Sequence, residues 1–309
     1  MIGSALSSML TTAGYQVHAL SRVKRDSPFY YQQSSKHLIL DPAVPLYAVI
    51  NLAGVNLAAS RWNAARKAEI LASRVQLTHA LATAIAAAPV RPELFLSASA
   101  IGYYGPTGST TATENSPPGN DFLAGVAQQW EQATAPAENA GINTIHLRFG
   151  VVLSKRGGML QQLLLPYKLG LGGPVGTGAQ YLSWISIADV EKIVLALLRE
   201  NPQSGPLNLV AQLVTNADFS AQLGNTLDRP SFLRLPALVV RLLFGEMGEA
   251  LLLGSNRVTS IKLPALGIPL DYPSLAAALR NILLGSRGSR GSRGSRGSRG
   301  SRGSRGQVT

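Results

Sequence analysis

The sequence predicts an α/β fold, a doubly wound parallel sheet followed by a small C-terminal lobe. Short apolar segments alternate with amphipathic helices from the start of the chain to about Val152, as they do in parallel β-α-β units with right-handed crossovers. Hydrophobic residues make up 46% of the 309 positions, which is enough to bury a large core. Beyond Val152 the segments become glycine-rich and are interrupted by prolines, which predicts a separate lobe.

The elements of the first half follow from local patterns. Residues 4–13 place Leu6, Met9 and Leu10 on one helical face, and Gly14 supplies a C-terminal stop. Apolar segments bounded by turn residues predict strands, and longer amphipathic segments predict helices. The predicted strands are 15–20, 47–52, 94–99 and 143–152, and the longer predicted helices are 63–87 and 121–140.

The second half holds fewer regular elements. An apolar helix is expected inside the glycine-rich segment 157–178. A strand over residues 181–187 then leads into a helix over 189–201, and another helix begins at its capping residue Thr215. These elements are expected to complete the sheet and to form a lobe over it.

The composition limits the classes of function. There is no cysteine, which excludes disulfides and thiolate metal sites, and the four histidines are too scattered to suggest a metal site. No apolar run reaches the roughly 20 residues of a membrane span, and the start lacks the basic segment of a signal peptide. A membrane partner is therefore not predicted, and a cytoplasmic location is the default expectation.

A Gly-Ser-Arg repeat dominates the charge. It begins at Gly285 and contributes seven arginines to the net charge of +12, which leaves about +5 for residues 1–284. Residues 285–309 cannot form a core and are expected to be disordered. The arginines could bind anions without specificity, but no aromatic residue is present to stack on bases. No specific nucleic-acid partner is predicted, and an expanded nine-nucleotide repeat explains the tail equally well.

Residues 94–131 are the most informative segment. The strand in it ends in two small hydroxyl residues, Ser97 and Ser99, at the end of a sheet where open α/β folds bind their ligands. A turn containing Tyr103 and Tyr104 and an acidic, proline-rich loop follow. Ser99 is a candidate to orient a carbonyl or hydroxyl group, and either tyrosine is a candidate to supply the proton. The alternative is that the tyrosines only line a pocket and stack on a ligand.

Ser21 and Arg22 end a predicted strand at the point where dinucleotide-binding folds select their cofactor. An acidic residue there binds the ribose 2′-hydroxyl of NAD, whereas an arginine pairs with the 2′-phosphate of NADP. The arginine therefore favours NADP. The alternative is a solvated basic turn.

A second group of residues could also contact a cofactor. Leu52, Ala53 and Gly54 end another strand, where the ribose and pyrophosphate of a dinucleotide could approach the backbone. On the following helix Glu69 and Arg74 lie about 1.4 turns apart. Both could reach cofactor or substrate oxygens, and the alternative is that they are ordinary surface charges.

The start of the chain predicts an incomplete phosphate-binding turn. Gly3 precedes an amphipathic helix, as does the last glycine of a Gly-x-x-Gly-x-x-Gly turn, which lets the helix pack close to a strand. The strand and the first two glycines of such a turn are not in the sequence. Without that central strand two buried edges would keep unpaired backbone groups, each costing about 1–3 kcal/mol. We therefore expect a fragment or a misassigned start rather than an evolved five-strand variant.

Several blocks of sequence together carry a family resemblance that covers residues 1–284. They are residues 49–54, 61–62, 73–74, 97–105, 116–122, 147–154, 169–174 and 183–185. These blocks resemble the epimerase family proteins, an atypical branch of the extended short-chain dehydrogenase/reductases that is similar to sugar-nucleotide epimerases. The resemblance implies a Rossmann fold that binds NADP(H). The cofactor contacts that it implies are Ser21, Arg22, Leu52, Ala53, Glu69 and Arg74.

Two departures separate the chain from the wider superfamily. The Tyr-x-x-x-Lys pair of short-chain dehydrogenases is absent, and its candidate positions hold Phe122, Leu123, Val126 and Ala127. The epimerase branch itself lacks this pair, so the reaction of its cousins does not carry over. Ser186 stands where relatives of the branch usually have the histidine of a Trp-Ile-His-Ile segment, which removes an acid/base group.

These inferences define the expected organisation and function. Residues 1–155 are expected to form a Rossmann domain that lacks its first strand, and residues 156–284 to add the last sheet elements and a substrate-side lobe. The leading hypothesis is an NADP(H)-dependent oxidoreductase or epimerase that acts on a small polar substrate, sugar derivatives included. The alternatives are an NADP(H)-binding sensor or scaffold without turnover, and an inactive truncated product.

Overall fold

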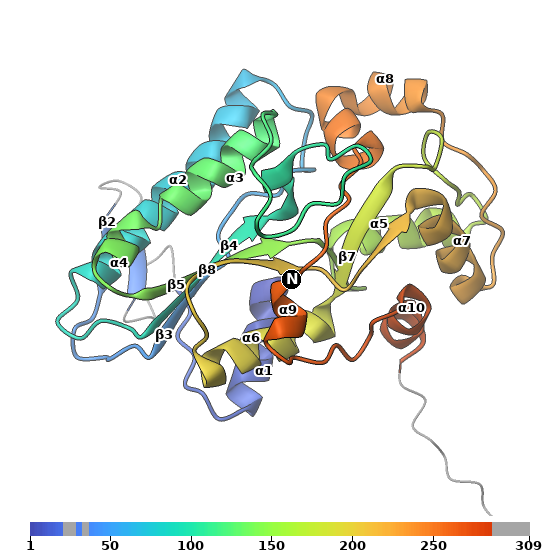
Figure 1. Cartoon of the computed structure of the whole chain (residues 1–309). Helices are drawn as coiled ribbons and strands as arrows, with labels where there is room; N and C mark the ends of the chain where they lie inside the picture. The colour runs from blue at the N-terminus through green and yellow to red at the C-terminus, as the bar shows by residue number, and fades with distance from the viewer. Residues whose placement is uncertain (21–28, 33–36, 286–309) are drawn as a thin grey trace, which may run out of the picture.

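The computed structural model describes residues 1–20, 29–32 and 37–285. Within these residues the centre of the molecule is a parallel sheet in the order β3-β4-β5-β8 (Figure 1). Its strands are β3 (Ala48–Asn51), β4 (Leu94–Ala100), β5 (Asn143–Phe149) and β8 (Gly205–Leu209). The parallel pairing and the intervening helices confirm the predicted α/β fold class.

Helices cover both faces of this sheet (Figure 1). On one face lie α2 (Ala64–Ala86), α3 (Phe122–Gln132) and α4 (Ala135–Asn139), and α2 and α4 share an apolar cluster with Phe95 of β4. On the other face α1 (Ile2–Thr12) packs on α6 (Ile187–Glu200), and their leucines and isoleucines join Leu96 and Leu147 of the sheet. The central strands lie between these two helical layers, and β4 is buried along almost its whole length.

The C-terminal lobe has its own small sheet. It consists of β6 (Val151–Leu153), β7 (Tyr181–Ser186) and β9 (Gln212–Thr215), in the order β6-β7-β9. This lobe contains a separate apolar cluster, formed with α5 (Gly158–Lys168), α7 (Asn216–Leu227) and α10 (Leu275–Leu284). The chain passes between the two sheets at Gly150, where a Cβ would lie only 2.8 Å from the carbonyl oxygen of Ser183. Glycine is therefore required where the strands of the two sheets meet.

The remaining elements connect the lobe to the main sheet. They are the short helix η1 (Ile101–Tyr104) after β4, then α8 (Ala237–Gly248), η2 (Glu249–Leu253) and α9 (Lys262–Ala265). The segment after η2 pairs with the loop that follows η1. Ala112 N donates to Arg257 O at 2.8 Å, and Thr259 N donates to Ala112 O at 3.0 Å. Residues 257–259 thus lie against a loop about 150 residues earlier in the sequence.

Three predicted elements differ in the structure. The strand predicted over 15–20 is absent. A strand forms only beside a neighbouring strand, and in the doubly wound order the neighbour of this segment is a strand that precedes α1. The described residues hold no strand before α1. The helix predicted over 121–140 is divided into α3 and α4, because the ring of Pro136 conflicts with a helical carbonyl at Gln132. The strand predicted over 143–152 is divided into β5 and β6 by Gly150.

Other features were not predicted, or cannot be compared. The antiparallel pair of β1 (Phe29–Gln32) and β2 (His37–Leu40) was not predicted. Ser21, Arg22 and the Gly-Ser-Arg repeat from residue 286 onward lie outside the described residues. In the part of the chain that the structure describes, no helix combines the length and the apolar character that a membrane crossing requires.

Candidate functional site

The carboxyl ends of β3, β4 and β5 bring polar residues together at one edge of the sheet. Asn51 of β3 is in register with Ser97 of β4, and Ser99 of β4 is in register with Arg148 of β5. All four side chains are buried. Asn51 Nδ2 donates to the hydroxyl oxygen of Thr78 on α2 at 2.7 Å. Parallel pairing therefore gathers polar groups from three strands at the edge where α/β sheets bind ligands.

A buried ion pair lies at the centre of this edge. Arg148 Nε and Nη2 donate to the two carboxylate oxygens of Glu131, each at 2.7 Å. Ser99 Oγ donates to Glu131 Oε1 at 2.6 Å, so its proton is engaged within the protein. Burial opposes the charge of Arg148, but the hydrogen bonds and the negative charge of Glu131 prevail and raise the pKa of Arg148 above its usual value. The guanidinium is therefore charged at neutral pH.

The two tyrosines of η1 contact Arg148 in different ways. The hydroxyl of Tyr104 accepts from Arg148 Nη1 at 2.8 Å and donates to Asn208 Oδ1 at 2.8 Å. Burial raises the pKa of Tyr104 above its usual value, against the opposing effect of the guanidinium. The ring of Tyr103 stacks on the guanidinium, with 3.5 Å between Arg148 Cζ and the ring centroid. Tyr103 is half-buried, and within the described residues its hydroxyl has no hydrogen-bond partner.

The acidic, proline-rich loop encloses the tyrosine turn. Gly119 N donates to the carbonyl oxygen of Tyr103 at 2.9 Å. A Cβ on Gly119 would lie 2.7 Å from the carbonyl oxygen of Tyr104, so no larger residue fits there without a shift of the backbone. The buried carboxylate of Glu114 accepts from Asn208 N at 3.1 Å and from Ile261 N at 3.0 Å. The loop thus connects the turn to β8 and to the C-terminal segment.

Sequence reasoning did not identify Glu114, Glu131, Arg148 or Asn208 as site residues. A signal was present for Arg148, which lies between Leu147 and Phe149 near the end of a predicted strand, because a charge in a buried strand needs a partner. Nothing in the sequence indicated which residue that partner is. Glu131 lies 17 residues earlier, on a helix, and only the packing of α3 against the sheet brings it into contact.

Several predicted cofactor residues meet where α1 begins and β3 ends. A Cβ on Gly3 would lie 3.7 Å from Leu52 Cδ1, so the first turn of α1 lies beside the end of β3. A Cβ on Gly54 would lie 3.0 Å from the guanidinium carbon of Arg74. Arg74 Nη2 donates to the carbonyl oxygen of Val55 at 3.1 Å and thereby holds the loop after β3. Gly3, Leu52, Gly54 and Arg74 are thus brought together.

Arg74 is a buried cation that no carboxylate of the described residues neutralises. Its side chain is 9% exposed, and its guanidinium carbon lies 5.1 Å from the centre of the Trp130 ring. Burial, and to a smaller extent the charge of Arg66, lowers the pKa of Arg74 to about 10. At neutral pH this guanidinium therefore carries a charge that an anionic ligand group would compensate.

The other predicted positions have different surroundings. Ala53 N donates to Asn51 Oδ1 at 3.1 Å, which shapes the same loop. The carboxylate of Glu69 is exposed and forms an ion pair with Arg66, away from the buried Arg74. Ser186, which stands in place of a histidine, caps α6. Its hydroxyl accepts from Asp189 N at 3.0 Å and donates to Asp189 Oδ2 at 2.7 Å.

Glu138 provides a test of the electrostatics beside the ion pair. His146 Nε2 lies 3.2 Å from Glu138 Oε1. The hydrogen bond with His146 is the main cause that lowers the pKa of Glu138; burial opposes it, and a hydrogen bond from Thr134 adds to it. A carboxyl with a depressed folded-state pKa stabilises the fold above its unfolded pKa of about 4.3, and this contribution is lost as the pH falls through the folded value.

We therefore expect Glu138→Gln to unfold at a lower temperature than the unmodified protein at neutral pH. In strong acid the two proteins should unfold at the same temperature, because the carboxyl is then protonated in both states. Thermal unfolding followed across the acid range measures this difference. A difference that grows as the pH falls would contradict the assignment.

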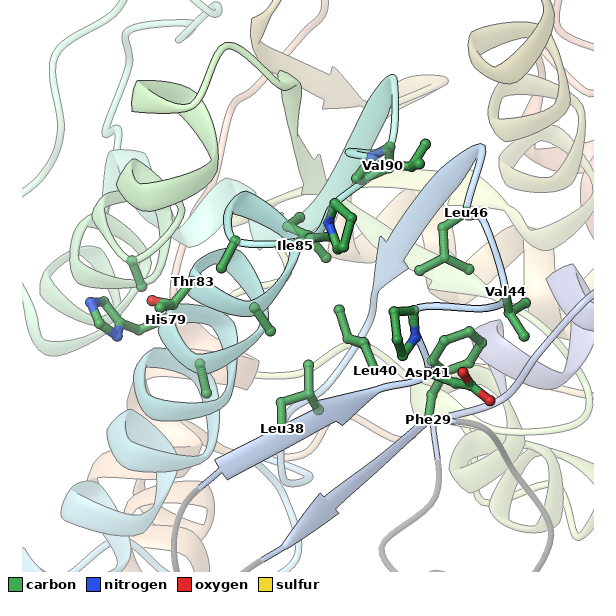
Figure 2. A pocket seen from close by; sticks show the side chains of 18 of the residues that line it. Phe29, Leu38, Leu40, Asp41, Val44, Leu46, His79, Thr83, Ile85 and Val90 are labelled. Carbon is green, nitrogen blue, oxygen red and sulfur yellow. The ribbon is translucent and has the colours of Figure 1, made fainter.

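A large cavity lies at the opposite end of the sheet (Figure 2). Its volume is about 1020 Å³, and it is lined by β2, by α2 and by the loops that lead into β3 and β4. Leu46 and Val90, which line it, precede the first residues of these strands, whereas Ser99 lies next to the last residue of β4 and Leu52 follows the last residue of β3. The cavity is therefore separate from the edge that holds the candidate residues. Within the described residues no group of three or more His, Asp or Glu side chains is arranged to hold a metal ion.

Comparisons with known proteins find relatives over almost the whole chain. Residues 1–209 match the model of the NAD dependent epimerase/dehydratase family, and residues 235–282 match a domain of unknown function, DUF1731. The chain is 36% identical over 285 residues to the epimerase family protein ML0860 of Mycobacterium leprae, covering 90% of this chain and 91% of that relative.

Solved structures show the same similarity. The crystal structure of the human epimerase family protein SDR39U1 with NADPH superposes with a TM-score of 0.83 at 34% identity, over 91% of this chain and 95% of that one. A nucleoside-diphosphate sugar epimerase from Corynebacterium glutamicum gives a TM-score of 0.70 at 32% identity, over 92% of this chain and 56% of that one.

Proposed function

The chain belongs to the NAD dependent epimerase/dehydratase family, and from this premise we propose that it is an NADP(H)-dependent oxidoreductase or epimerase acting on a small polar substrate. The observation that carries the proposal is the buried guanidinium of Arg74 beside Gly54, at the carboxyl end of β3, which no carboxylate in the described part of the chain compensates. A phosphate group of a dinucleotide would supply the missing negative charge. The binding of NADPH by the human relative supports this choice of ligand.

The residues around β3 fit such a cofactor. Gly3 lies beside Leu52, Gly54 lies against the guanidinium of Arg74, and Leu52 and Ala53 directly follow the end of the strand. We propose that Ser21 and Arg22 hold the 2′-phosphate and that Arg74 faces the pyrophosphate, while exposed Glu69 contacts the cofactor only at its outer edge. When bound, the nicotinamide would supply hydride transfer.

We propose that the chemistry takes place at the end of β4. Ser99, Tyr103 and Tyr104 are the hydroxyl groups there, and the Glu131–Arg148 ion pair fixes their positions. A substrate with carbonyl or hydroxyl groups fits this polar surface, and the nucleoside-diphosphate sugar epimerase among the relatives supports a sugar derivative.

One observation favours a second function, an NADP(H)-binding sensor or scaffold without turnover. Both Ser99 and Tyr104 donate their hydroxyl protons to groups of the protein, Glu131 and Asn208. If Tyr103 also proves dispensable, none of the three hydroxyl groups proposed for the chemistry would remain to move a proton.

Binding measurements test the cofactor assignment. We expect NADPH to bind more tightly than NADH, by about 1.5–3 kcal/mol for charge-assisted hydrogen bonds to the 2′-phosphate. Isothermal titration with both cofactors measures this preference, and Arg22→Ala should remove it. Arg91→Ala is the matched control and should keep it, because the Arg91 guanidinium donates to Ala86 O and Ala140 O, before β4 begins. Equal affinities for the two cofactors in the unmodified chain would disprove the assignment.

Turnover is tested separately. Single-turnover oxidation of bound NADPH is followed against a panel of aldehydes, ketones and keto-sugars. A protein that binds NADPH tightly but oxidises it with no member of the panel would replace the enzyme proposal with the sensor.

A further inference from the structure

Three hydroxyl groups near the end of β4 are proposed for the chemistry, those of Ser99, Tyr103 and Tyr104, and their surroundings make them chemically unequal. Ser99 is 2% exposed and Tyr104 is 5% exposed. Ser99 donates to Glu131 Oε1, and Tyr104 donates to Asn208 Oδ1 while accepting from Arg148. A hydroxyl that moves a proton to a substrate must be within hydrogen-bond reach of it. These two hydroxyls are buried and already bonded, which leaves Tyr103.

Tyr103 has the opposite properties. It is half-buried, and no hydrogen bond from its hydroxyl to any described residue is present. The geometry of η1 explains the difference, because consecutive residues of a 3₁₀ helix point about 120° apart. Because the side chain of Tyr104 is directed into the protein, the side chain of Tyr103 points in a different direction and is less buried.

The ring of Tyr103 is nevertheless held firmly. It stacks on Arg148 at 3.5 Å and packs edge-on against the ring of Tyr104, with 5.3 Å between the centroids. Arg148 cannot rotate, because three of its nitrogens donate to Glu131 and Tyr104. A planar guanidinium fixed on both edges offers a rigid surface for an aromatic ring.

We propose that Tyr103 is the residue that exchanges a proton with the substrate, and that Arg148, fixed by Glu131, is the positioning residue that holds its ring. When a carbonyl is reduced, the Tyr103 hydroxyl gives its proton to the carbonyl oxygen, and the phenolate regains a proton from water. Oxidation of an alcohol runs the same transfer in reverse, and in both directions the dinucleotide exchanges the hydride. This inference rests on the proposed function, and it assigns to Ser99 and Tyr104 the role of supporting the ion pair.

Kinetic measurements on three tyrosine variants test the proton transfer. Tyr103→Phe keeps the stacked ring and should therefore keep the melting temperature and NADPH affinity, while single-turnover NADPH oxidation slows by about 10²–10⁴-fold. Tyr104→Phe should lower the melting temperature and slow the reaction less than Tyr103→Phe. Tyr47→Phe is the matched control, since Tyr47 bonds to Leu198 O near the opposite end of β3, and its rate should not change. A Tyr103→Phe protein that reacts at the unmodified rate overturns the proposal.

Arg148→Lys tests the positioning role, because lysine keeps the charge and loses the planar surface. The rate should fall with little change in the KM for substrate, whereas a rate equal to that of the unmodified protein overturns the role. A second readout needs no turnover. In protein with ¹³C-labelled tyrosine rings, the Tyr103 resonance, identified by its loss in Tyr103→Phe, should move in Arg148→Lys, and the Tyr47 resonance should stay.

These two readouts separate the failures. An unmodified protein that turns over no member of the panel overturns the proposed function and the proton transfer with it. The ring resonance then still decides the positioning role: a Tyr103 resonance that does not move in Arg148→Lys overturns that role, whatever the rates are.

Discussion

Replacing Glu131 with glutamine should lower the free energy of unfolding by about 3–5 kcal/mol, because it leaves the charge of Arg148 buried without its counter-ion. Arg148 is 3% exposed, and both of its contacts with Glu131 are 2.7 Å long. The amide of glutamine can accept only one of these hydrogen bonds, and it carries no charge. Urea unfolding at neutral pH measures the loss.

Glu249→Gln is the matched control for this experiment. Glu249 also forms a two-contact ion pair with an arginine, Arg241, but both side chains are more than half exposed. Exposed ion pairs contribute little to stability, so the urea midpoint of Glu249→Gln should equal that of the unmodified protein. If the two variants unfold at the same midpoint, the Glu131–Arg148 pair does not contribute as the structure implies.

Gly119→Ala should slow turnover by about 10²-fold, the scale expected when reacting groups are displaced by about 1 Å. The added Cβ would lie 2.7 Å from the carbonyl oxygen of Tyr104 and 2.8 Å from Gly105 Cα, both backbone atoms that cannot rotate away. The turn that carries Tyr103 must therefore shift. The unfolding free energy should fall by about 1–3 kcal/mol, as for other overpacked sites.

Gly125→Ala, six residues further along in α3, is the control for Gly119→Ala. An added Cβ there meets no atom within 4 Å, and the position is helical. Alanine should leave turnover unchanged and stabilise the helix by about 0.5–1 kcal/mol. Rates for the two glycine variants that agree within a factor of two would contradict the proposed coupling between the loop and the turn.

Much of the fold could be predicted from local sequence. Gly14 ends α1 with a φ of +91°, and Asn63 and Thr215 cap helices by accepting from the third residue beyond them. Such signals act within one turn of a helix, so they can be read from the sequence. The segment 15–20 was predicted wrongly for the complementary reason, because a strand depends on a neighbouring strand, and that neighbour can come from any part of the chain.

The candidate site was less predictable than the fold. The hydroxyl residues at the end of β4 could be found because they follow an apolar strand. Whether these hydroxyls are hydrogen-bonded could not be predicted, since the partners of Ser99 and Tyr104 come from α3, β5 and β8. A pattern in one segment indicates which groups are present at an edge, whereas hydrogen bonds across segments decide which of them is free.

The pairing between the loop after η1 and residues 255–261 bears on how this protein can vary in evolution. The two family matches end and begin at residues 209 and 235, as if the second were an appended module. Yet Ile261 N, within the second match, donates to Glu114 in the first, and Ser183 Oγ donates to Val258 O. If the C-terminal segment were replaced by an unrelated one, the buried carboxylate of Glu114 and the edge of β7 at Ser183 would lose their hydrogen-bond partners. The two segments are therefore expected to be inherited together, and changes around Glu114 to be matched by changes around Ile261.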